Sequence, residues 1–308
     1  MQLHVLSNES NGPARRLPPW LRRPLPSGDF SSTKRIVAES GVATVCEEAR
    51  CPNLSECWSR RHATFMILGD KCTRRCGFCA VNTAVPDPPA QDEPARLADG
   101  VRKLDLAHVV ITSVARDDLA DEGAGHFAEC VRRIHDACDE TTVEVLPADF
   151  HGRLACIQTL VDARPELYNH NLETVDRLTR SVRPAGRYRR SLDVLATVKR
   201  LDSGIITKSG LMVGLGESTD ELYTAFRDLR DAGCDVLTVG QYLRPTTDGH
   251  LPVEKFYHPD EFEEMAAYAR SLDFLGVACG PFVRSSYNAD EVFAESRRRL
   301  SGRSSAGS

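Results

Sequence analysis

The chain has 308 residues, of which 41% are hydrophobic and 27% charged, a composition typical of globular proteins. Its formal net charge of −5 argues against general affinity for nucleic acid or for an anionic membrane surface. No apolar run reaches the roughly 18 residues that a membrane-spanning helix needs. We therefore expect neither nucleic-acid nor membrane partners. The length fits one large α/β domain or two ordinary ones.

The N-terminal stretch, residues 1–28, is polar and rich in Pro and Arg. It lacks the apolar core of a secretory signal, and Glu9 together with the early prolines disfavours the amphipathic helix of an organelle transit peptide. Eleven cysteines without such a signal favour a reducing compartment, in which clustered thiols bind metals. We predict a loose N-terminal arm and a cytoplasmic location, with an organelle matrix as the less favoured alternative.

Two groups of three cysteines come next along the chain. The first group is Cys46, Cys51 and Cys57, and the second is Cys72, Cys76 and Cys79. Thiolates select zinc, copper(I) or iron–sulfur clusters, but a structural zinc site needs a fourth ligand, and none follows the second group at the usual spacing. An iron–sulfur cube held by three cysteines leaves one iron open for a substrate or cofactor. We expect Arg74 and Arg75, which lie between thiols of the second group, to favour the thiolate form.

Beyond residue 62, apolar β-rich runs alternate with segments of helical periodicity at a repeat of roughly thirty residues, the size of a βα unit. The expected strands are residues 63–69, 108–114, 141–147, 165–171, 205–215 and 235–243. The expected helices include residues 126–138, 153–164, 191–202, 221–233 and 259–273. Because no GxGxxG motif follows the first strand, we predict an α/β fold of the partial (β/α)6-type TIM barrel, with N-terminal and C-terminal extensions.

Polar side chains gather where the predicted strands end, which is where barrels of this kind carry their reactive sites. They include Thr112, Ser113, Arg116, Asp117, Asn169, Asn171, Glu173, Gln241, Tyr242 and Arg244. Ordinary loop polarity is an alternative explanation for each residue taken singly. The cysteines that follow the first strand favour the functional explanation for the set.

The spacing Cys72-x3-Cys76-x2-Cys79 after the first strand resembles the radical S-adenosylmethionine (SAM) enzymes. The resemblance implies that these catalytic cysteines hold a 4Fe–4S cluster whose open iron is chelated by SAM. One electron from the cluster then cleaves SAM to methionine and a 5′-deoxyadenosyl radical, which takes hydrogen from unactivated carbon. The barrel would hold the radical against one C–H bond and exclude water.

The upstream spacing Cys46-x4-Cys51-x5-Cys57 resembles the auxiliary-cluster motif of lipoyl synthases, a family of sulfur-inserting transferases. The similarity continues through ITSVARDDLADEGA, HNLETV, KSGLMVGLGE and CGPFVRSSY, over about residues 18–290. It implies insertion of two sulfur atoms at C6 and C8 of a protein-bound octanoyl-lysine chain. A second, sacrificial 4Fe–4S cluster would donate the sulfur, with Ser286 as its fourth and weak ligand.

The same resemblance implies partners and cofactor contacts. The partners are an octanoylated lipoyl carrier protein or domain, an electron donor such as flavodoxin or ferredoxin, and iron–sulfur assembly or carrier proteins. The predicted SAM contacts are Thr112, Ser113, Asn171, Glu173, Arg183, Gly214 and Gly216. For the glycines, ordinary strand-to-helix packing is the alternative. The arginines of VRPAGRYRR are either a solvated helix start or a dock for an acidic carrier or a cofactor carboxylate.

We predict three segments: residues 1–62 with the arm and auxiliary cysteines, residues 63–283 as the barrel, and residues 284–308 as the RSSY segment and tail. Residues 296–308 are expected to be disordered. Many members of the family have Pro, Asp and His at the positions of Gly77, Ala80 and Asn288, which puts carrier preference in doubt.

Three rival functions differ in testable ways. A biotin-synthase-like enzyme would also insert sulfur, but its auxiliary ligands are not arranged upstream of the radical motif with a terminal serine. A non-catalytic iron–sulfur electron carrier predicts four permanent ligands for each cluster and no barrel with polar strand ends. A zinc protein would be colourless and would contain no labile sulfide.

Overall fold

The computed structural model describes residues 17–22 and 30–306. The arm predicted over residues 1–28 therefore lies largely outside the described residues. Its described part contains a short 3-10 helix, η1 (Pro19–Leu21), in which the Trp20 indole donates a hydrogen bond to the Tyr257 carbonyl oxygen at 3.1 Å. In the described part of the chain, every helix is too short or too polar to cross a bilayer.

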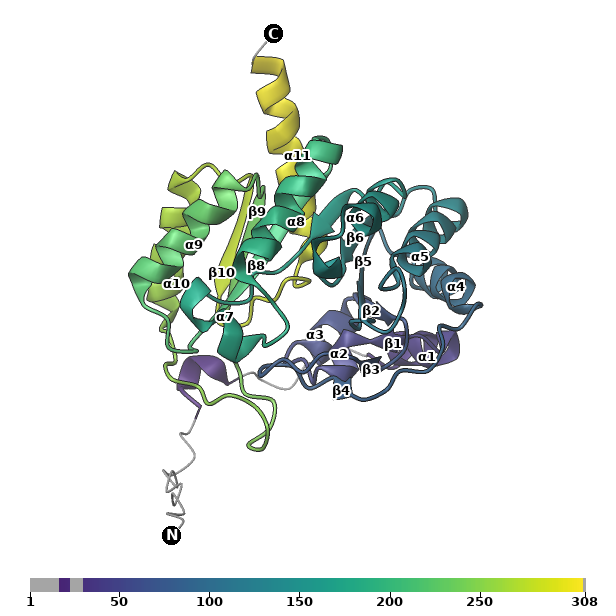
Figure 1. Cartoon of the computed structure of the whole chain (residues 1–308), viewed down its shortest axis with the longest axis horizontal. Helices are drawn as coiled ribbons and strands as arrows, with labels where there is room; N and C mark the ends of the chain where they lie inside the picture. The colour runs from purple at the N-terminus through teal and green to yellow at the C-terminus, as the bar shows by residue number, and fades with distance from the viewer. Residues whose placement is uncertain (1–16, 23–29, 307–308) are drawn as a thin grey trace, which may run out of the picture.

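An eight-stranded sheet forms the centre of the molecule, and its strand order follows chain order (Figure 1). The strands are β1 (Ala43–Thr44), β2 (Thr64–Ile67), β5 (His108–Ser113), β6 (Thr142–Leu146), β7 (Leu167–Asn169), β8 (Ile206–Val213), β9 (Val236–Gln241) and β10 (Gly276–Gly280). All strands from β2 to β10 run parallel, which confirms the six predicted strands and adds β10, whereas β1 pairs antiparallel with β2. No ladder joins the outer strands β1 and β10 within residues 30–306, so the sheet is an open, partial barrel.

Helices cover the outer face of this sheet, as the alternating pattern predicts (Figure 1). They are α4 (Glu93–Leu104), α5 (Ala124–Ala137), α6 (Leu154–Val161), α8 (Tyr188–Leu201), α9 (Thr219–Asp231) and α10 (Pro259–Ser271), with the short α7 (Asp176–Val182) before α8. Local sequence fixes several helix starts; α9, for example, begins at a capping box of Ser218 and Glu221. Apolar strand side chains such as Phe65 and Ile111 are fully buried in the hydrophobic core that these helices share with the sheet.

Alternate residues of each strand point into the barrel, and among them Glu144, Asn169 and Lys208 are buried polar or charged side chains. The Lys208 ammonium on β8 donates to both Glu144 carboxylate oxygens on β6, each at 3.0 Å. Asn169, on the strand between them, donates to Glu144 Oε1 at 2.8 Å. Burial alone would raise the pKa of Glu144, but Lys208 and His108 hold it below its usual range. These buried groups therefore form an ion pair rather than two isolated charges.

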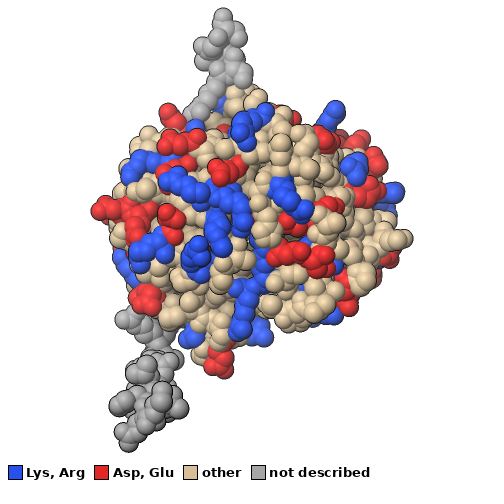
Figure 2. Space-filling view, viewed as in Figure 1, with Lys and Arg blue, Asp and Glu red and all other residues tan. Residues whose placement is uncertain are grey.

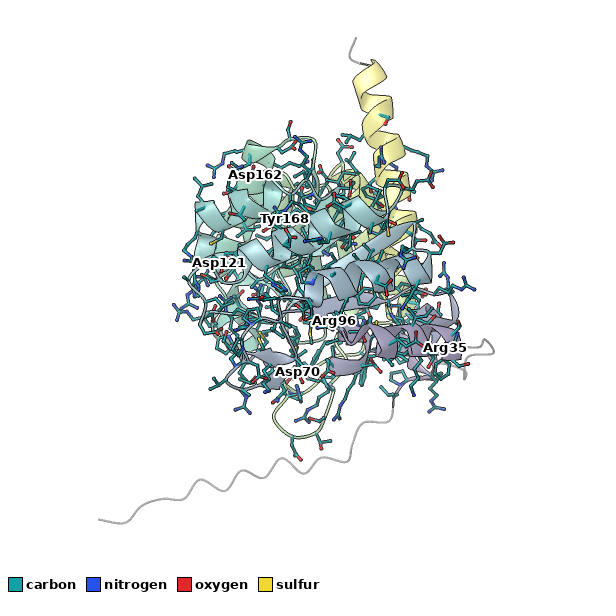
Figure 3. The ribbon with its side chains drawn as sticks, turned by 90° about the vertical axis from the view of Figure 1, so that its right-hand side faces the viewer. Arg35, Asp70, Arg96, Asp121, Asp162 and Tyr168 are labelled. Carbon is teal, nitrogen blue, oxygen red and sulfur yellow. The ribbon has the colours of Figure 1, made fainter. Side chains whose placement is uncertain are left out.

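Along the chain, one extension precedes the barrel and the other follows it. Helices α1 (Ser31–Ser40), α2 (Val45–Glu48) and α3 (Leu54–Ser59) precede β2, and α11 (Ala289–Ala306) follows β10. Figures 1 and 3 show α11 extending away from the rest of the molecule. The predicted disorder of residues 296–308 is wrong as far as Ala306. Phe293 stacks on His108 with 5.1 Å between ring centroids, and Glu295 pairs with Arg299 one turn later, so the helix has both a packed face and local support.

Candidate functional site

The second cysteine group lies on a loop that leaves the C-terminal end of β2. The short strands β3 (Lys71–Cys72) and β4 (Asn82–Thr83) pair in parallel and close the base of this loop. The backbone N–H groups of Arg74 and Ala115 point at the Cys72 sulfur from 3.4 and 3.3 Å. Donors aimed at a sulfur stabilise negative charge on it, so the geometry suits a metal-binding thiolate.

Cys76 and Cys79 lie in more enclosed positions on the same loop. Burial raises the pKa of Cys76 to about 12, although the Arg183 guanidinium acts in the opposite direction. Burial also raises the pKa of Cys79 to about 11, against a hydrogen bond from the Val81 backbone. The negative charge of Glu173 adds to the increase at both thiols. Such thiols keep their protons at neutral pH until a bound cation displaces them.

Two other segments hold this loop in place. The Gly77 N–H donates to the Val182 carbonyl oxygen at the end of α7 at 2.9 Å. The Leu251 N–H donates to the Gly77 carbonyl oxygen, also at 2.9 Å, and His250 Nε2 lies 3.0 Å from the Cys79 carbonyl oxygen. The connection between β9 and α10, which carries His250 and Leu251, thus supports the cysteine loop. The sequence alone gives no local signal for this contact, because the two segments lie far apart along the chain.

Arg74 does not have the role that its position next to the cysteines suggests. Its Nε donates to Asp117 Oδ2 at 2.8 Å and its Nη1 donates to Asp149 Oδ1 at 2.7 Å. Burial opposes the charged form, but these carboxylates raise the pKa of Arg74 above its usual range. Its charge is therefore neutralised by carboxylates, and the expectation that its guanidinium favours the thiolates is wrong. The guanidinium that acts against the raised pKa of Cys76 belongs to Arg183.

The residues after β7 face this loop. Glu173 adopts a φ of 67°, in the left-handed region that is strained for a residue other than glycine. Burial raises its pKa, while Arg183 and a hydrogen bond from Asn171 act against the increase. Arg183 Nη1 donates to the Asn171 and Leu172 carbonyl oxygens at 2.9 and 3.3 Å, which fixes the backbone that presents Glu173. The structure thus brings Asn171, Glu173 and Arg183 together beside Cys76.

The remaining predicted cofactor residues are Thr112, Ser113, Gly214 and Gly216. The Thr112 hydroxyl donates to the Leu146 carbonyl oxygen at 2.8 Å, and Ser113 is the last residue of β5. Gly214 has a φ of 103°, and a Cβ there would lie 2.5 Å from the Lys255 carbonyl oxygen. Gly216 also has a positive φ, of 102°. Local packing and hydrogen bonding account for Thr112 and Gly214, and a cofactor role for these four residues stays a prediction.

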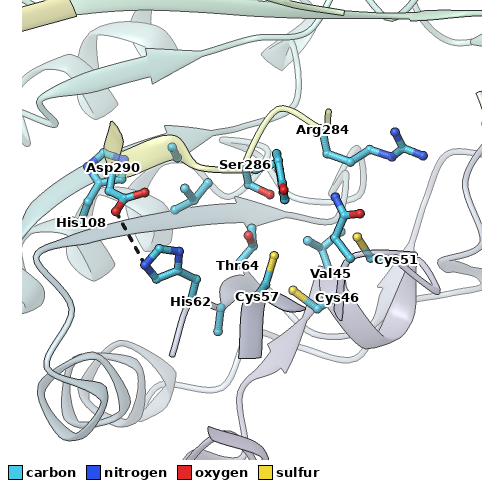
Figure 4. A pocket seen from close by; sticks show the side chains of 15 residues that line it. Val45, Cys46, Cys51, Cys57, His62, Thr64, His108, Arg284, Ser286 and Asp290 are labelled. Atoms are coloured by element: carbon cyan, nitrogen blue, oxygen red, sulfur yellow. Dashed lines mark ion pairs between the residues drawn. The ribbon is translucent and has the colours of Figure 1, made fainter. Parts of the chain in front are cut away.

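The first cysteine group lines a pocket with the C-terminal segment (Figure 4). Cys46 comes from α2, Cys57 from α3 and Cys51 from the turn between these helices, where its N–H donates to the Cys46 carbonyl oxygen at 3.0 Å. Ser286 lines the same pocket, and Figure 4 shows it on the segment across from the cysteine side chains. Three thiols and one hydroxyl form a donor set that fits an iron–sulfur cluster with one weak ligand.

Long-range hydrogen bonds seat the segment that carries Ser286. The Asn53 amide donates to the Phe282 carbonyl oxygen at 2.7 Å, and the Tyr287 hydroxyl donates to Glu56 Oε1 at 2.8 Å. On β9, Gly240 lies so close to the Val283 carbonyl oxygen that a Cβ would overlap it. Sequence reasoning did not single out these contacts, because each joins residues far apart along the chain.

The two cysteine sites lie at opposite ends of the same strands. The loop with Cys72 follows the C-terminal end of β2, whereas Thr64 and His108, at the starts of β2 and β5, line the pocket with Ser286. One side chain links the two regions: Asn171 Nδ2 lies 3.1 Å from Glu173 Oε1 and 3.3 Å from the hydroxyl of Ser285.

Comparison with known proteins adds a family and a fold. Residues 66–229 match the model of the Radical SAM superfamily. Among solved structures, the maturase HydG of the FeFe-hydrogenase has a TM-score of 0.56 at 14% identity, covering 87% of this chain and 67% of that protein. Methylornithine synthase has a TM-score of 0.55 at 16% identity, covering 70% of this chain and 63% of that protein. These similarities support the partial-barrel fold.

Curated relatives are much more similar in sequence. A lipoyl synthase of Symbiobacterium thermophilum is 50% identical over 303 residues, covering 98% of this chain and 94% of the relative. A lipoyl synthase of Desulfotalea psychrophila is 50% identical over 277 residues, covering 90% of this chain and 92% of the relative. The chain therefore belongs to the lipoyl synthase family of radical SAM enzymes.

Proposed function

We propose that the protein inserts two sulfur atoms, at C6 and C8, into an octanoyl chain carried on a lysine of another protein. The observation that carries the proposal is that Ser286 lines the same pocket as Cys46, Cys51 and Cys57. Serine is a poorer iron ligand than cysteine, so it suits a cluster that must release iron and give up sulfur. An electron carrier, which keeps its cluster, gains nothing from such a ligand.

In this proposal Cys72, Cys76 and Cys79 hold the 4Fe–4S cluster that binds SAM. When bound, the cluster and SAM supply a radical that removes hydrogen from unactivated carbon. Glu173 and Asn171 are suited to hydrogen-bond the amino group or ribose of SAM, because they lie at the end of β7 beside Cys76. Arg183 holds their backbone and opposes the increase that burial causes in the pKa of Cys76. The barrel would keep water away from the reacting carbon.

Cys46, Cys51, Cys57 and Ser286 would hold the second 4Fe–4S cluster, the sulfur donor. The substrate would be an octanoylated lipoyl carrier protein or domain. A flavodoxin-like or ferredoxin-like donor would supply electrons, and iron–sulfur carrier proteins would rebuild the spent cluster. We keep the cytoplasm as the proposed compartment, since a reducing environment leaves these thiols free to bind iron. We also keep the proposed segments: residues 1–62, 63–283 and 284–308.

The test uses anaerobically reconstituted full-length protein with SAM, a reductant and an octanoyl-lysine peptide, and reads the products by mass spectrometry. We expect 5′-deoxyadenosine and a peptide that has gained two sulfur atoms. Deoxyadenosine without sulfur insertion would mean that the protein is a radical SAM enzyme with a different substrate. Neither product, from protein shown to hold two intact clusters, would favour an electron carrier.

Two cysteine variants separate the proposed roles. Cys76→Ala should abolish SAM cleavage while the auxiliary cluster remains, because only the first cluster loses a ligand. Cys51→Ala should still form 5′-deoxyadenosine but insert no sulfur. SAM cleavage by the first variant, or a sulfur-containing product from the second, would show that the ligand assignment is wrong.

A further inference from the structure

Three exposed arginines flank the short connection between α7 and α8. Arg180 lies in the last turn of α7, and Arg187 and Arg189 lie at the N-terminal end of α8. In Figure 2, Lys and Arg side chains gather near the middle of the face shown, over the region where Figure 1 places α7 and α8. We call Arg180, Arg187 and Arg189 the rim arginines.

The rim arginines differ from their neighbours in having no carboxylate partner among the described residues. Arg187 donates only to the backbone carbonyl oxygens of Pro184 and Gly186, and the Arg189 guanidinium lies 5.9 Å from the centre of the Tyr188 ring.

Other arginines of the same stretch are neutralised. Arg177 pairs with Glu221 at 2.7 Å, and Arg190 pairs with Asp149 at 2.8 Å. Arg183 is buried against backbone carbonyl oxygens. The rim arginines therefore give a local positive charge to a chain with a formal net charge of −5. Exposed guanidinium groups of this kind attract carboxylates.

The rim arginines also lie next to the proposed site of radical formation. The α7 helix ends at Val182, whose carbonyl oxygen accepts a hydrogen bond from Gly77 in the cysteine loop. Helix α8 begins at the same face, because the helix of a βα unit starts near the C-terminal end of the preceding strand. A protein that threads a modified lysine into the barrel from this face would contact the rim arginines.

We propose that the rim arginines are the docking surface for an acidic face of the protein that carries the octanoyl-lysine. The proposal rests on the proposed function and adds the place and charge of the contact. Rim charges mainly speed and orient encounter, so they affect the KM for a protein substrate more than the chemical step. A short octanoyl-lysine peptide, which lacks the acidic face, would bypass them.

The experiment reverses two of these charges in the full-length protein, as Arg180→Glu with Arg189→Glu. A matched control, Arg164→Glu with Arg200→Glu, reverses two exposed arginines before β7 and at the end of α8, which is the opposite end of the barrel. Each double variant adds the same negative charge. Both are assayed with an octanoylated carrier protein and with the octanoyl-lysine peptide, at low and high salt.

For the rim variant we expect the KM for the carrier to rise about tenfold at low salt, with kcat and the KM for the peptide unchanged. The difference should shrink at high salt, where the charges are screened. The control should match the unaltered protein. An unchanged KM for the carrier would overturn the proposal. So would a KM for the peptide or for SAM that rises as much as the KM for the carrier. If the glutamate variant does not fold, Arg180→Gln with Arg189→Gln is the second variant, with a smaller expected increase for the carrier alone. An unaltered protein that modifies neither substrate would instead refute the proposed function.

Discussion

Gly240 sets how closely the C-terminal segment approaches the sheet. An added Cβ would overlap the Val283 carbonyl oxygen, three residues before Ser286. Backbone atoms cannot yield as a flexible side chain can, so we expect Gly240→Ala to displace Ser286. The variant should retain about half of the bound iron and still cleave SAM, without inserting sulfur.

Iron analysis and product mass spectrometry check this expectation, with Gly302→Ala as the control. No heavy atom lies within 4 Å of a Cβ added at Gly302, on α11. That control should keep its full iron content, because alanine suits a helix better than glycine. Normal sulfur insertion by Gly240→Ala would show that the close approach to Val283 is not needed.

His170 makes stability depend on pH. It is buried between the Pro147 carbonyl oxygen and the Ser191 hydroxyl, at 3.3 and 3.1 Å. Burial, helped by Arg183, lowers the pKa of His170 to about 4, against the opposing effect of Asp149. An unfolded chain binds this proton near pH 6.5, so the folded state loses stability as the pH falls from about 6.5 to about 4.

Urea unfolding of the protein without clusters, at pH 7 and pH 5, measures this effect. In His170→Gln, we expect the loss of unfolding free energy between these pH values to be smaller than in the unaltered protein by about 2 kcal/mol. Equal losses in both proteins would mean that His170 titrates normally in the fold.

At the scale of elements, the Asn171 side chain links the β7–α7 connection to the C-terminal segment. Asn171 Nδ2 lies within hydrogen-bonding distance of both Glu173 Oε1 and the Ser285 hydroxyl. Because Ser285 precedes Ser286, we expect Asn171 to help seat the serine ligand. Asn171→Ala and Ser285→Ala should each lower the number of sulfur atoms inserted per SAM cleaved.

A double-mutant cycle tests this link. If Asn171 acts through Ser285, the double variant should be no worse than the more impaired single variant. Strictly additive losses would mean that the two side chains act independently.

At the scale of the whole molecule, the Glu144–Lys208 pair ties β6 to β8 across β7 inside the barrel. Removing one partner leaves the other charge buried and unpaired. We expect Lys208→Met to lower the free energy of unfolding by about 3–5 kcal/mol. Adding Glu144→Gln should recover part of that loss, and urea unfolding measures both. If the double variant were as unstable as Lys208→Met alone, the unpaired charge would not be the cause.

The fold was predictable where local pattern sufficed. The period of apolar residues located six strands, and the cysteine spacing with the RSSY resemblance singled out Cys46, Cys51, Cys57 and Ser286, which the structure brings to one pocket. Their role as cluster ligands stays a proposal. Arg74 was misjudged because proximity along the chain says nothing about Asp117 and Asp149, which neutralise it. The seating of Ser286 by Asn53 and Gly240 could not be predicted, because these contacts join residues brought together only by the folded sheet.

The two cysteine sites lie at opposite ends of β2, so this strand separates them. This strand has four residues, which span about 13 Å at the usual rise of a strand. Its two ends set the gap between the loop with Cys72 and the pocket with Ser286. In the proposed reaction, the carbon that loses hydrogen must also take sulfur from the pocket with Ser286, so SAM and that carbon would together have to span this gap.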